Sequence, residues 1–273
     1  MKQTDIKLIS CDMDGTLLSR NGGVSVEARK LIQSLANHQV IFSIASGRMP
    51  HRIEKHVASF IQKPNQYYVA SNGALVICKG EVIFEKRFPV KPYRELILDF
   101  VRRGLEFDFD YDDSYRPLFA SERTIRCAND VRGYADPIGI EDDVWRLRVN
   151  KISVMDPLDS GILNEFIRGM REIGNCTPFQ YGVHASEIVP ENCSKFTGLQ
   201  HLISHLKITE EQVLAIGDHT NDIEMLSSCG ASAAVGNAVE EVRQSAKYRC
   251  RKEYDQGVVE AIQHYLPFLQ TPI

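Results

Sequence analysis

Two acidic residues, Asp12 and Asp14, follow an apolar run and stand just before Gly15. Side chains two positions apart on an extended chain point to the same side. Two like charges on one side repel each other unless a cation, a proton or a nearby base relieves them. Aspartate and glycine also favour ordinary turns, but the preceding strand and the following Thr16 make a chemical site the better interpretation of this pair.

Polar side chains end two further strand candidates in the same way. Ser46 closes a second apolar run, and Asp218 and Asp222 follow a third. In an open α/β sheet, functional groups collect where strands end at their carboxyl edge, so we expect these side chains and the first acidic pair at one edge. Their oxygens suit Mg²⁺. Taken singly, Ser46 could be a helix N-cap and Asp218 another.

An acidic pocket repels a phosphate group unless a positive charge compensates, and Lys195 is the candidate for that charge. It stands near the start of a predicted helix, and a lysine acts on phosphate as a point charge. Backbone N–H groups at Ser46 and Gly47 could add to this binding. A carboxylate nucleophile, a metal, a hydroxyl and a lysine together indicate phosphoryl transfer through an aspartyl-phosphate.

The elements that must position these groups alternate between strand and helix at both ends of the chain, as expected of a parallel sheet with crossover helices. We therefore predict an α/β fold with a Rossmann-like parallel-sheet core. The predicted strands span residues 6–11, 40–45, 67–70, 212–216 and 232–235, and the predicted helices 25–38, 194–206, 221–227 and 255–266.

The middle of the chain has a different pattern. A hairpin is expected at residues 74–88 around the Lys79–Gly80 turn. Helices and strands then mix without regular alternation, which is typical of an α+β insert. We predict a catalytic core of residues 1–84 and 188–273, and an inserted cap domain of residues 85–187.

Composition excludes several classes of protein. The 273 residues are 43% hydrophobic and 25% charged, with a net charge of −4, which gives no indication of nucleic-acid or membrane-surface binding. No apolar run approaches a membrane span, and the N-terminus lacks a signal-peptide pattern. The odd, scattered cysteines indicate reduced thiols and a cytoplasmic location. They are Cys11, Cys78, Cys127, Cys176, Cys193, Cys229 and Cys250.

Four motifs, in order along the chain, resemble those of the haloacid dehalogenase (HAD) superfamily. They are "DMDGTL", "SGR", Lys195 and "GDHTND". The stretches "SNGA", "VGNA" and "DQGV" also look like the Cof-type branch, in which a large α/β cap is inserted between the second and third motifs. The family usually has glycine after the lysine, where this chain has Phe196.

The resemblance implies roles for the acidic residues. Asp12 would be the nucleophile and a Mg²⁺ ligand. Asp14 would be the general acid for the leaving group and then the base for water, and would bind Mg²⁺ through its backbone carbonyl. Asp218 would complete the metal site, and Asp222 would support it without direct ligation.

The resemblance also implies a phosphate-binding set. The hydroxyl of Ser46 and the N–H of Gly47 would hold the phosphoryl oxygens, and Asn221 would reach the phosphate. Lys195 would neutralise charge on the nucleophile and on the phosphoryl group.

We therefore expect a Mg²⁺-dependent phosphatase that hydrolyses small phosphorylated metabolites, such as sugar phosphates or phosphorylated cofactors. A phosphomutase with the same phospho-aspartate chemistry is one alternative, and a non-hydrolytic phospho-acceptor or binding protein is another. The expected partner is a small-molecule substrate, with no nucleic acid and no membrane, and the protein is expected to be a monomer or a homodimer.

Overall fold

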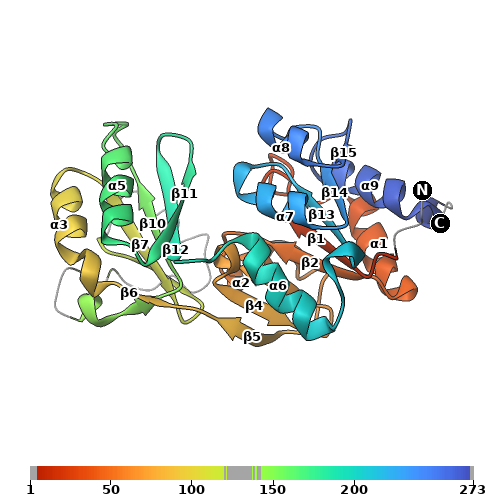
Figure 1. Ribbon diagram of the computed structural model, residues 1–273, viewed down its shortest axis with the longest axis horizontal. Coiled ribbons are helices and arrows are strands. Elements are labelled where there is room, and N and C mark those ends of the chain that lie inside the picture. The colour runs from red at the N-terminus through yellow and green to blue at the C-terminus, as the bar shows by residue number, and fades with distance from the viewer. Residues whose placement is uncertain (1–4, 120, 122–136, 138, 140–142, 271–273) are drawn as a thin grey trace. The chain divides into compact units, whose positions relative to one another are not determined.

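The computed structural model describes residues 5–119, 121, 137, 139 and 143–270 (Figure 1). The chain divides into two compact units, and each is described by itself. Unit 1 comprises Met1–Ser46, Ile53–Phe84 and Ser194–Ile273, and unit 2 comprises Gly47–Arg52 and Glu85–Cys193. The assignment of residues 1–84 and 188–273 to a catalytic core, and of residues 85–187 to a cap, remains a prediction.

Unit 1 is built on an eight-stranded sheet in the order β15-β14-β13-β1-β2-β3-β4-β5. Pairing is parallel from β15 to β3, and β4 is antiparallel to β3. The strands are β1 (Leu8–Asp12), β2 (Ile41–Ala45), β3 (Tyr67–Ala70), β4 (Leu75–Cys78), β5 (Glu81–Glu85), β13 (Val213–Gly217), β14 (Ala231–Ala234) and β15 (Tyr248–Arg249). The predicted α/β fold is confirmed.

The central strand β1 is buried along its whole length, as expected of a parallel strand covered on both faces. Cys11 pairs with Ile216 of β13, and Asp12 pairs with Ala45 of β2. Figure 1 shows these three strands side by side. Their carboxyl ends therefore meet at one edge of the sheet, as the sequence pattern predicts.

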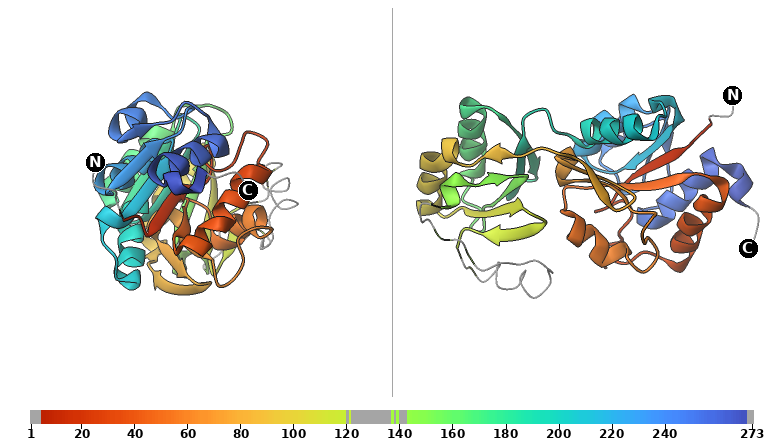
Figure 2. Two further views of the ribbon diagram at one scale, coloured as in Figure 1. Left: turned by 90° about the vertical axis from the view of Figure 1, so that its right-hand side faces the viewer. Right: turned by 90° about the horizontal axis from the view of Figure 1, so that it is seen from below.

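Helices cover both faces of this sheet. Figure 2 (right) shows α1 and α9 on one face and α6 and α7 on the other. The helices are α1 (Val26–Leu35), α2 (Pro50–Val57, which begins in the short segment of unit 2), α6 (Lys195–Leu206), α7 (Ile223–Ser228), α8 (Glu240–Ser245) and α9 (Tyr254–Tyr265). Short 3₁₀ turns are η1 (Ala36–His38), η2 (Ser71–Gly73), η5 (Glu210–Gln212), η6 (Thr220–Asp222) and η7 (Pro267–Gln270).

Helix α1 illustrates why these segments are helical. The hydroxyl of Ser25 accepts a hydrogen bond from the Ala28 N–H, so the serine is the N-cap. The apolar side chains recur at helical spacing and are all buried on one face. They are Ala28, Leu31, Ile32 and Leu35, the face that the sequence predicts.

Unit 2 contains a five-stranded sheet in the order β11-β12-β10-β7-β8, in which every pairing is antiparallel. Its strands are β7 (Glu106–Tyr111), β8 (Ser114–Pro117), β10 (Lys151–Met155), β11 (Cys176–Tyr181) and β12 (Ala185–Pro190), and β6 (Phe88–Pro89) pairs with β9 (Arg148–Val149). Its helices are α3 (Arg94–Arg102) and α5 (Leu163–Ile173), with 3₁₀ turns η3 (Lys91–Tyr93) and η4 (Val144–Arg146).

The core of unit 2 lies between its sheet and its two helices. Phe107 on β7 packs edge-on against Phe166 on α5, which also contacts Phe100 on α3. The alternate residues of β7, Asp108 and Asp110, are buried as well, and they lie on the other face because side chains alternate along a strand.

The predicted hairpin at residues 74–88 is present as β4 and β5, with Lys79 and Gly80 in the left-handed turn between them at φ 55° and 77°. Both strands extend the large sheet of unit 1. The six cysteines in the described part of the chain are free thiols, and Cys127 lies outside it. Among the described residues, no helix has the length and apolar character needed to cross a membrane.

Candidate active site

The site is centred on Lys195, whose ammonium lies between two carboxylates. Its Nζ is 2.5 Å from Oδ1 of Asp12 at the end of β1 and 2.7 Å from Oδ1 of Asp222 in η6. All three residues are buried. A lysine is rarely fully buried unless it is paired, so these contacts account for its position.

The first turn of α6 places Lys195 there. Ser194 is the N-cap and forms a capping box with Thr197. The helix start packs closely against η2, where a Cβ on Gly73 would lie 1.9 Å from the Ser194 carbonyl oxygen. A Cβ on Gly198 would lie 2.6 Å from the Cα of Gly73. The chain therefore has its close-packing glycine three residues after the lysine, although Phe196 directly follows it.

Asp218 follows β13 and contacts the turn that follows β1. The hydroxyl of Thr16 donates a 2.6 Å hydrogen bond to Oδ1 of Asp218. Gly15 lies against the same carboxylate at φ +86°, and a Cβ there would come within 2.4 Å of Oδ2. Glycine is required here because both the backbone conformation and the space exclude a side chain.

Asp222 holds the loop between β13 and α7. Its Oδ2 accepts hydrogen bonds from the N–H groups of Asp218 and His219, each at 3.1 Å. Because Oδ1 accepts from Lys195, both oxygens already have protein donors. Asp222 therefore links Lys195 to the backbone of the loop that carries Asp218.

Three carboxylates form a cluster that could hold a metal ion, and they belong to Asp12, Asp218 and Asp222. One ligand atom from each lies within 4.8 Å of the others. The three ionised carboxylates carry −3 and Lys195 carries +1, so the cluster has a net charge of −2. A single divalent cation would balance that charge, and carboxylate oxygens are ligands that hard cations prefer. The donor set fits Mg²⁺.

The electrostatics of the cluster follow from burial. Burial raises the pKa of Asp12 well above its ordinary value; Lys195 lowers this pKa, and the neighbouring Asp222 and Asp218 carboxylates raise it further. Burial also raises the pKa of Asp218. For Lys195, burial alone lowers the pKa, but the Asp12 and Asp222 carboxylates together raise it. The lysine therefore stays charged, and the carboxylates favour a further cation or a proton.

Asp14 has a different environment from Asp12. The strand ends at Asp12, so the alternation of side chains along a strand does not extend to Asp14. Its side chain is exposed and does not belong to the metal cluster. One strand end thus presents a buried carboxylate and an accessible one, two environments that suit two different tasks.

Two of the remaining predicted site residues, Ser46 and Asn221, belong to unit 1, and the third, Gly47, belongs to unit 2. In unit 1, Ser46 is buried directly after β2, and its N–H donates to the Val69 carbonyl at 2.8 Å. Asn221 in η6 donates to Oδ1 of Asn72 at 3.2 Å. Gly47 belongs to the short segment of unit 2, where its carbonyl accepts a 2.7 Å hydrogen bond from Lys151.

The sequence analysis assigned no side-chain role to three residues in these contacts, although it quoted their motifs and used Thr16 as a neighbour of the acidic pair. Thr16 stands inside "DMDGTL" and Asn72 inside "SNGA", and each donates or accepts within the site. Asn237, inside "VGNA", donates a 2.7 Å hydrogen bond to the Gly15 carbonyl. Only their membership in recognisable motifs could have indicated them, because a lone threonine or asparagine carries no spacing signal.

The chain matches the family model for haloacid dehalogenase-like hydrolases over residues 9–262. This chain belongs to that family. The family prediction is confirmed, and with it the prediction of a hydrolase.

The similarity of this haloacid dehalogenase-like hydrolase to its relatives extends over nearly the whole chain. A Bacillus subtilis protein named 5-amino-6-(5-phospho-D-ribitylamino)uracil phosphatase YcsE is 28% identical, with 97% of this chain and 98% of that protein covered. An HMP-PP phosphatase of Yersinia enterocolitica is 25% identical, with 95% of each covered.

Solved structures show the same fold. A haloacid dehalogenase-like hydrolase from Bacteroides thetaiotaomicron superposes with a TM-score of 0.80 at 24% identity, and 95% of this chain and 99% of that chain are covered.

Proposed function

We propose that this chain is a Mg²⁺-dependent phosphatase that hydrolyses small phosphorylated metabolites through a phosphoryl group carried on Asp12. The observation that carries the proposal is the buried Lys195 ammonium between Asp12 and Asp222, with Asp218 beside them. Such a cluster can hold an anionic phosphoryl group beside a carboxylate nucleophile.

In the first step, a carboxylate oxygen of Asp12 forms a bond to phosphorus while the bond from phosphorus to the leaving-group oxygen breaks. Asp14 gives its proton to that oxygen, so the leaving group departs as a neutral alcohol. Lys195 stays charged beside Asp12 and offsets negative charge as it develops.

In the second step, Asp14 accepts a proton from water, and the water oxygen attacks phosphorus. The bond to Asp12 breaks, inorganic phosphate leaves, and the carboxylate is restored. This is general acid–base catalysis with one residue in both directions. Asp14 is exposed, as this double role requires.

The other site residues support binding. We assign Ser46, the N–H of Gly47 and Asn221 to the phosphoryl oxygens. Asp12, the Asp14 carbonyl and Asp218 would hold Mg²⁺, with Asp222 in support. When bound, the ion supplies positive charge that stabilises the phosphoryl oxygens in the transition state.

We assign substrate selection to the inserted domain of residues 85–187 and the chemistry to residues 1–84 and 188–273. Because two relatives are named as phosphatases of a phosphorylated ribitylaminouracil and of HMP-PP, phosphorylated compounds of these kinds head the substrate panel, followed by sugar phosphates.

The test is release of inorganic phosphate from 4-nitrophenyl phosphate with and without Mg²⁺, followed by the substrate panel. Asp12→Asn and Asp14→Asn should each lose at least about 10²-fold in kcat, whereas Asp5→Asn, an exposed aspartate of the same unit, should match the wild type. Metal-independent release, or full activity in Asp12→Asn, would contradict the proposal. An isomeric sugar phosphate in place of free phosphate would indicate a mutase.

A further inference from the structure

The motifs "VGNA" and "DQGV" meet around one backbone carbonyl, that of Lys252. The Gly236 N–H donates to this oxygen at 2.7 Å. A Cβ on Gly236 would lie 2.8 Å from the same oxygen, and one on Gly257 would lie 2.4 Å from it. Packing thus accounts for both glycines, but it does not account for Asn237.

The side chain of Asn237 bridges two segments that are far apart in the sequence. Its Nδ2 donates to the Gly15 carbonyl at 2.7 Å, and its Oδ1 accepts from the Tyr254 N–H at 2.9 Å. The next residue but one, Val239, donates its N–H to the Asp218 carbonyl at 3.1 Å. The segment around Asn237 therefore contacts both the loop that follows β1 and the loop that follows β13.

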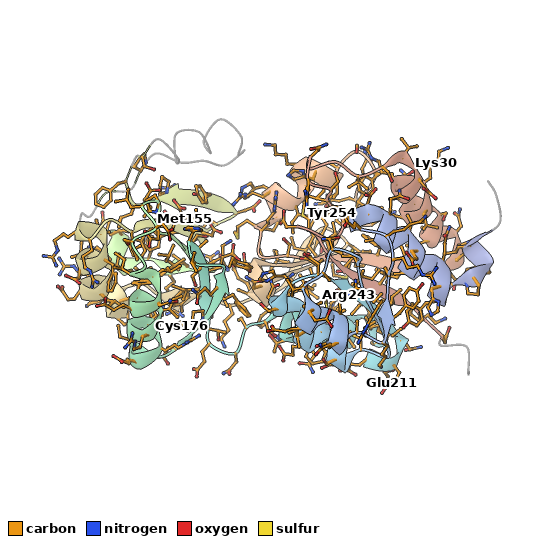
Figure 3. All side chains as sticks on the ribbon, turned by 90° about the horizontal axis from the view of Figure 1, so that it is seen from above. Lys30, Met155, Cys176, Glu211, Arg243 and Tyr254 are labelled. Atoms are coloured by element: carbon orange, nitrogen blue, oxygen red, sulfur yellow. The ribbon has the colours of Figure 1, made fainter. Side chains whose placement is uncertain are left out.

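The anchor at Tyr254 is unusual. Tyr254, labelled in Figure 3, begins α9 with φ +50°, a left-handed conformation that bulky residues rarely adopt. Residues in such conformations persist only where the surroundings hold them, and they cluster at functional sites. The Asn237 carboxamide supplies one such contact, because it satisfies an N–H at the start of the helix that has no partner within the helix.

Gly15 is a suitable point of attachment because the backbone of a glycine is less restricted than that of any other residue. It follows Asp14 directly and has φ +86°. Thr16 fixes the next residue by its hydrogen bond to Asp218. The Asn237 bond fixes the peptide between Gly15 and Thr16, so it restricts the backbone that carries the Asp14 side chain.

We propose that Asn237 is a positioning residue that holds the turn bearing Asp14 in the geometry needed for proton transfer to the leaving group. This inference rests on the proposed function, because it concerns the acid step of that reaction. It makes a specific claim: loss of Asn237 weakens leaving-group protonation more than it weakens phosphoryl transfer itself.

Two substrates separate these effects. The 4-nitrophenolate ion is a weak base and departs without a proton, whereas the alkoxide of a sugar needs one. The value of kcat/KM reports the steps up to formation of the phospho-aspartate, which include the departure of this group. A misplaced acid therefore lowers kcat/KM for a sugar phosphate selectively, and a general structural defect lowers both values equally.

The experiment compares kcat/KM for 4-nitrophenyl phosphate with that for the sugar phosphate that wild type hydrolyses fastest. Asn237→Asp keeps the acceptor for Tyr254 and loses the donor to Gly15, and Asn237→Ser, which is too short to reach, is the second variant. The control is Gln256→Glu, the same amide-to-acid change at a nearby contact with the Ser25 hydroxyl. The ratio of the two values cancels the fraction of folded enzyme.

We expect both Asn237 variants to lose about 10- to 100-fold with the sugar phosphate and less than about 3-fold with 4-nitrophenyl phosphate, with Gln256→Glu unchanged. Equal losses with both substrates, no loss, the same selective loss in Gln256→Glu, or unfolding of both Asn237 variants would overturn the inference alone. Absence of phosphate release by wild type would overturn the proposed function and this inference with it.

Discussion

Replacing Lys195 by methionine tests whether the ammonium holds the carboxylate cluster together. The change keeps the length and apolar stem of the side chain and removes its charge. Two ion pairs are lost, to Asp12 and to Asp222, and both partners are buried. Breaking a buried ion pair on one side costs about 3–5 kcal/mol, because an uncompensated charge stays behind.

The predicted effect on melting is large. A loss of about 1 kcal/mol lowers the melting temperature of a domain of 150–250 residues by about 2–4 °C, so the variant should melt about 6–20 °C lower at pH 7 without metal. Mg²⁺ should restore part of this loss, because the cluster then carries three unbalanced negative charges. Phosphate release should be abolished.

The loss should also depend on pH, and its sign follows from Asp12. Its pKa in the folded protein is already raised above the ordinary 3.8, and removing Lys195 takes away the main influence that lowers it. Between 3.8 and the folded value, the folded variant binds more protons than the unfolded chain, so its stability rises as pH falls. The difference from wild type should therefore shrink from pH 8 toward pH 4.

The assay is thermal unfolding followed by circular dichroism from pH 4 to pH 8, with and without Mg²⁺. Lys247→Met is the matched control, since this lysine is exposed and its ammonium donates to the backbone carbonyls of Cys229 and Gly230. It should melt within about 2 °C of wild type. A Lys195→Met variant that melts with the control at every pH would refute the reasoning.

Two further predictions concern the backbone and unit 2. Gly73→Ala should destabilise unit 1 by at least about 1–3 kcal/mol, because φ is +89° and the added Cβ would overlap the Ser194 carbonyl; an unchanged urea midpoint would contradict the close approach. Asp156 is buried, and although burial opposes the shift, hydrogen bonds from Ser160 and Gly161 lower its pKa below 3.8. Its stabilising contribution is therefore present above pH 3.8 and lost as pH falls through the folded value. Asp156→Asn should lower the unfolding midpoint of unit 2 at pH 6 and have a smaller effect at pH 2. An equal effect at both pH values would argue against an ionised carboxylate.

Much of unit 1 could be predicted from local signals. The buried run before Asp12 and the helical spacing of residues 26–35 are periodic patterns, and periodicity reflects burial directly. The strand ends carried polar groups that a buried strand would not tolerate without a function. The fold class and the edge of the sheet where the cluster forms followed from these patterns alone.

Local signals could not predict which residues complete the site. Four of these residues contact segments that lie more than a hundred residues away in the sequence or on another helix. They are Asn72, Asn237, Gly73 and Gly198. Such contacts depend on the strand order of the sheet, and no property of the local sequence records that order. The environment of Asp14 likewise depended on where β1 ends.

The sequence by itself determined the residue types of the site, the strands that end there and the family to which the chain belongs, because motif spacing and hydrophobic periodicity are local properties. Only the tertiary structure decided that Asp12 is buried against Lys195 while Asp14 is exposed. It also decided that Asn237 donates a hydrogen bond to the Gly15 carbonyl, in the turn that follows Asp14. Burial and long-range hydrogen bonds arise from packing of distant segments, and they determine which of the two carboxylates is buried in the cluster and which is exposed.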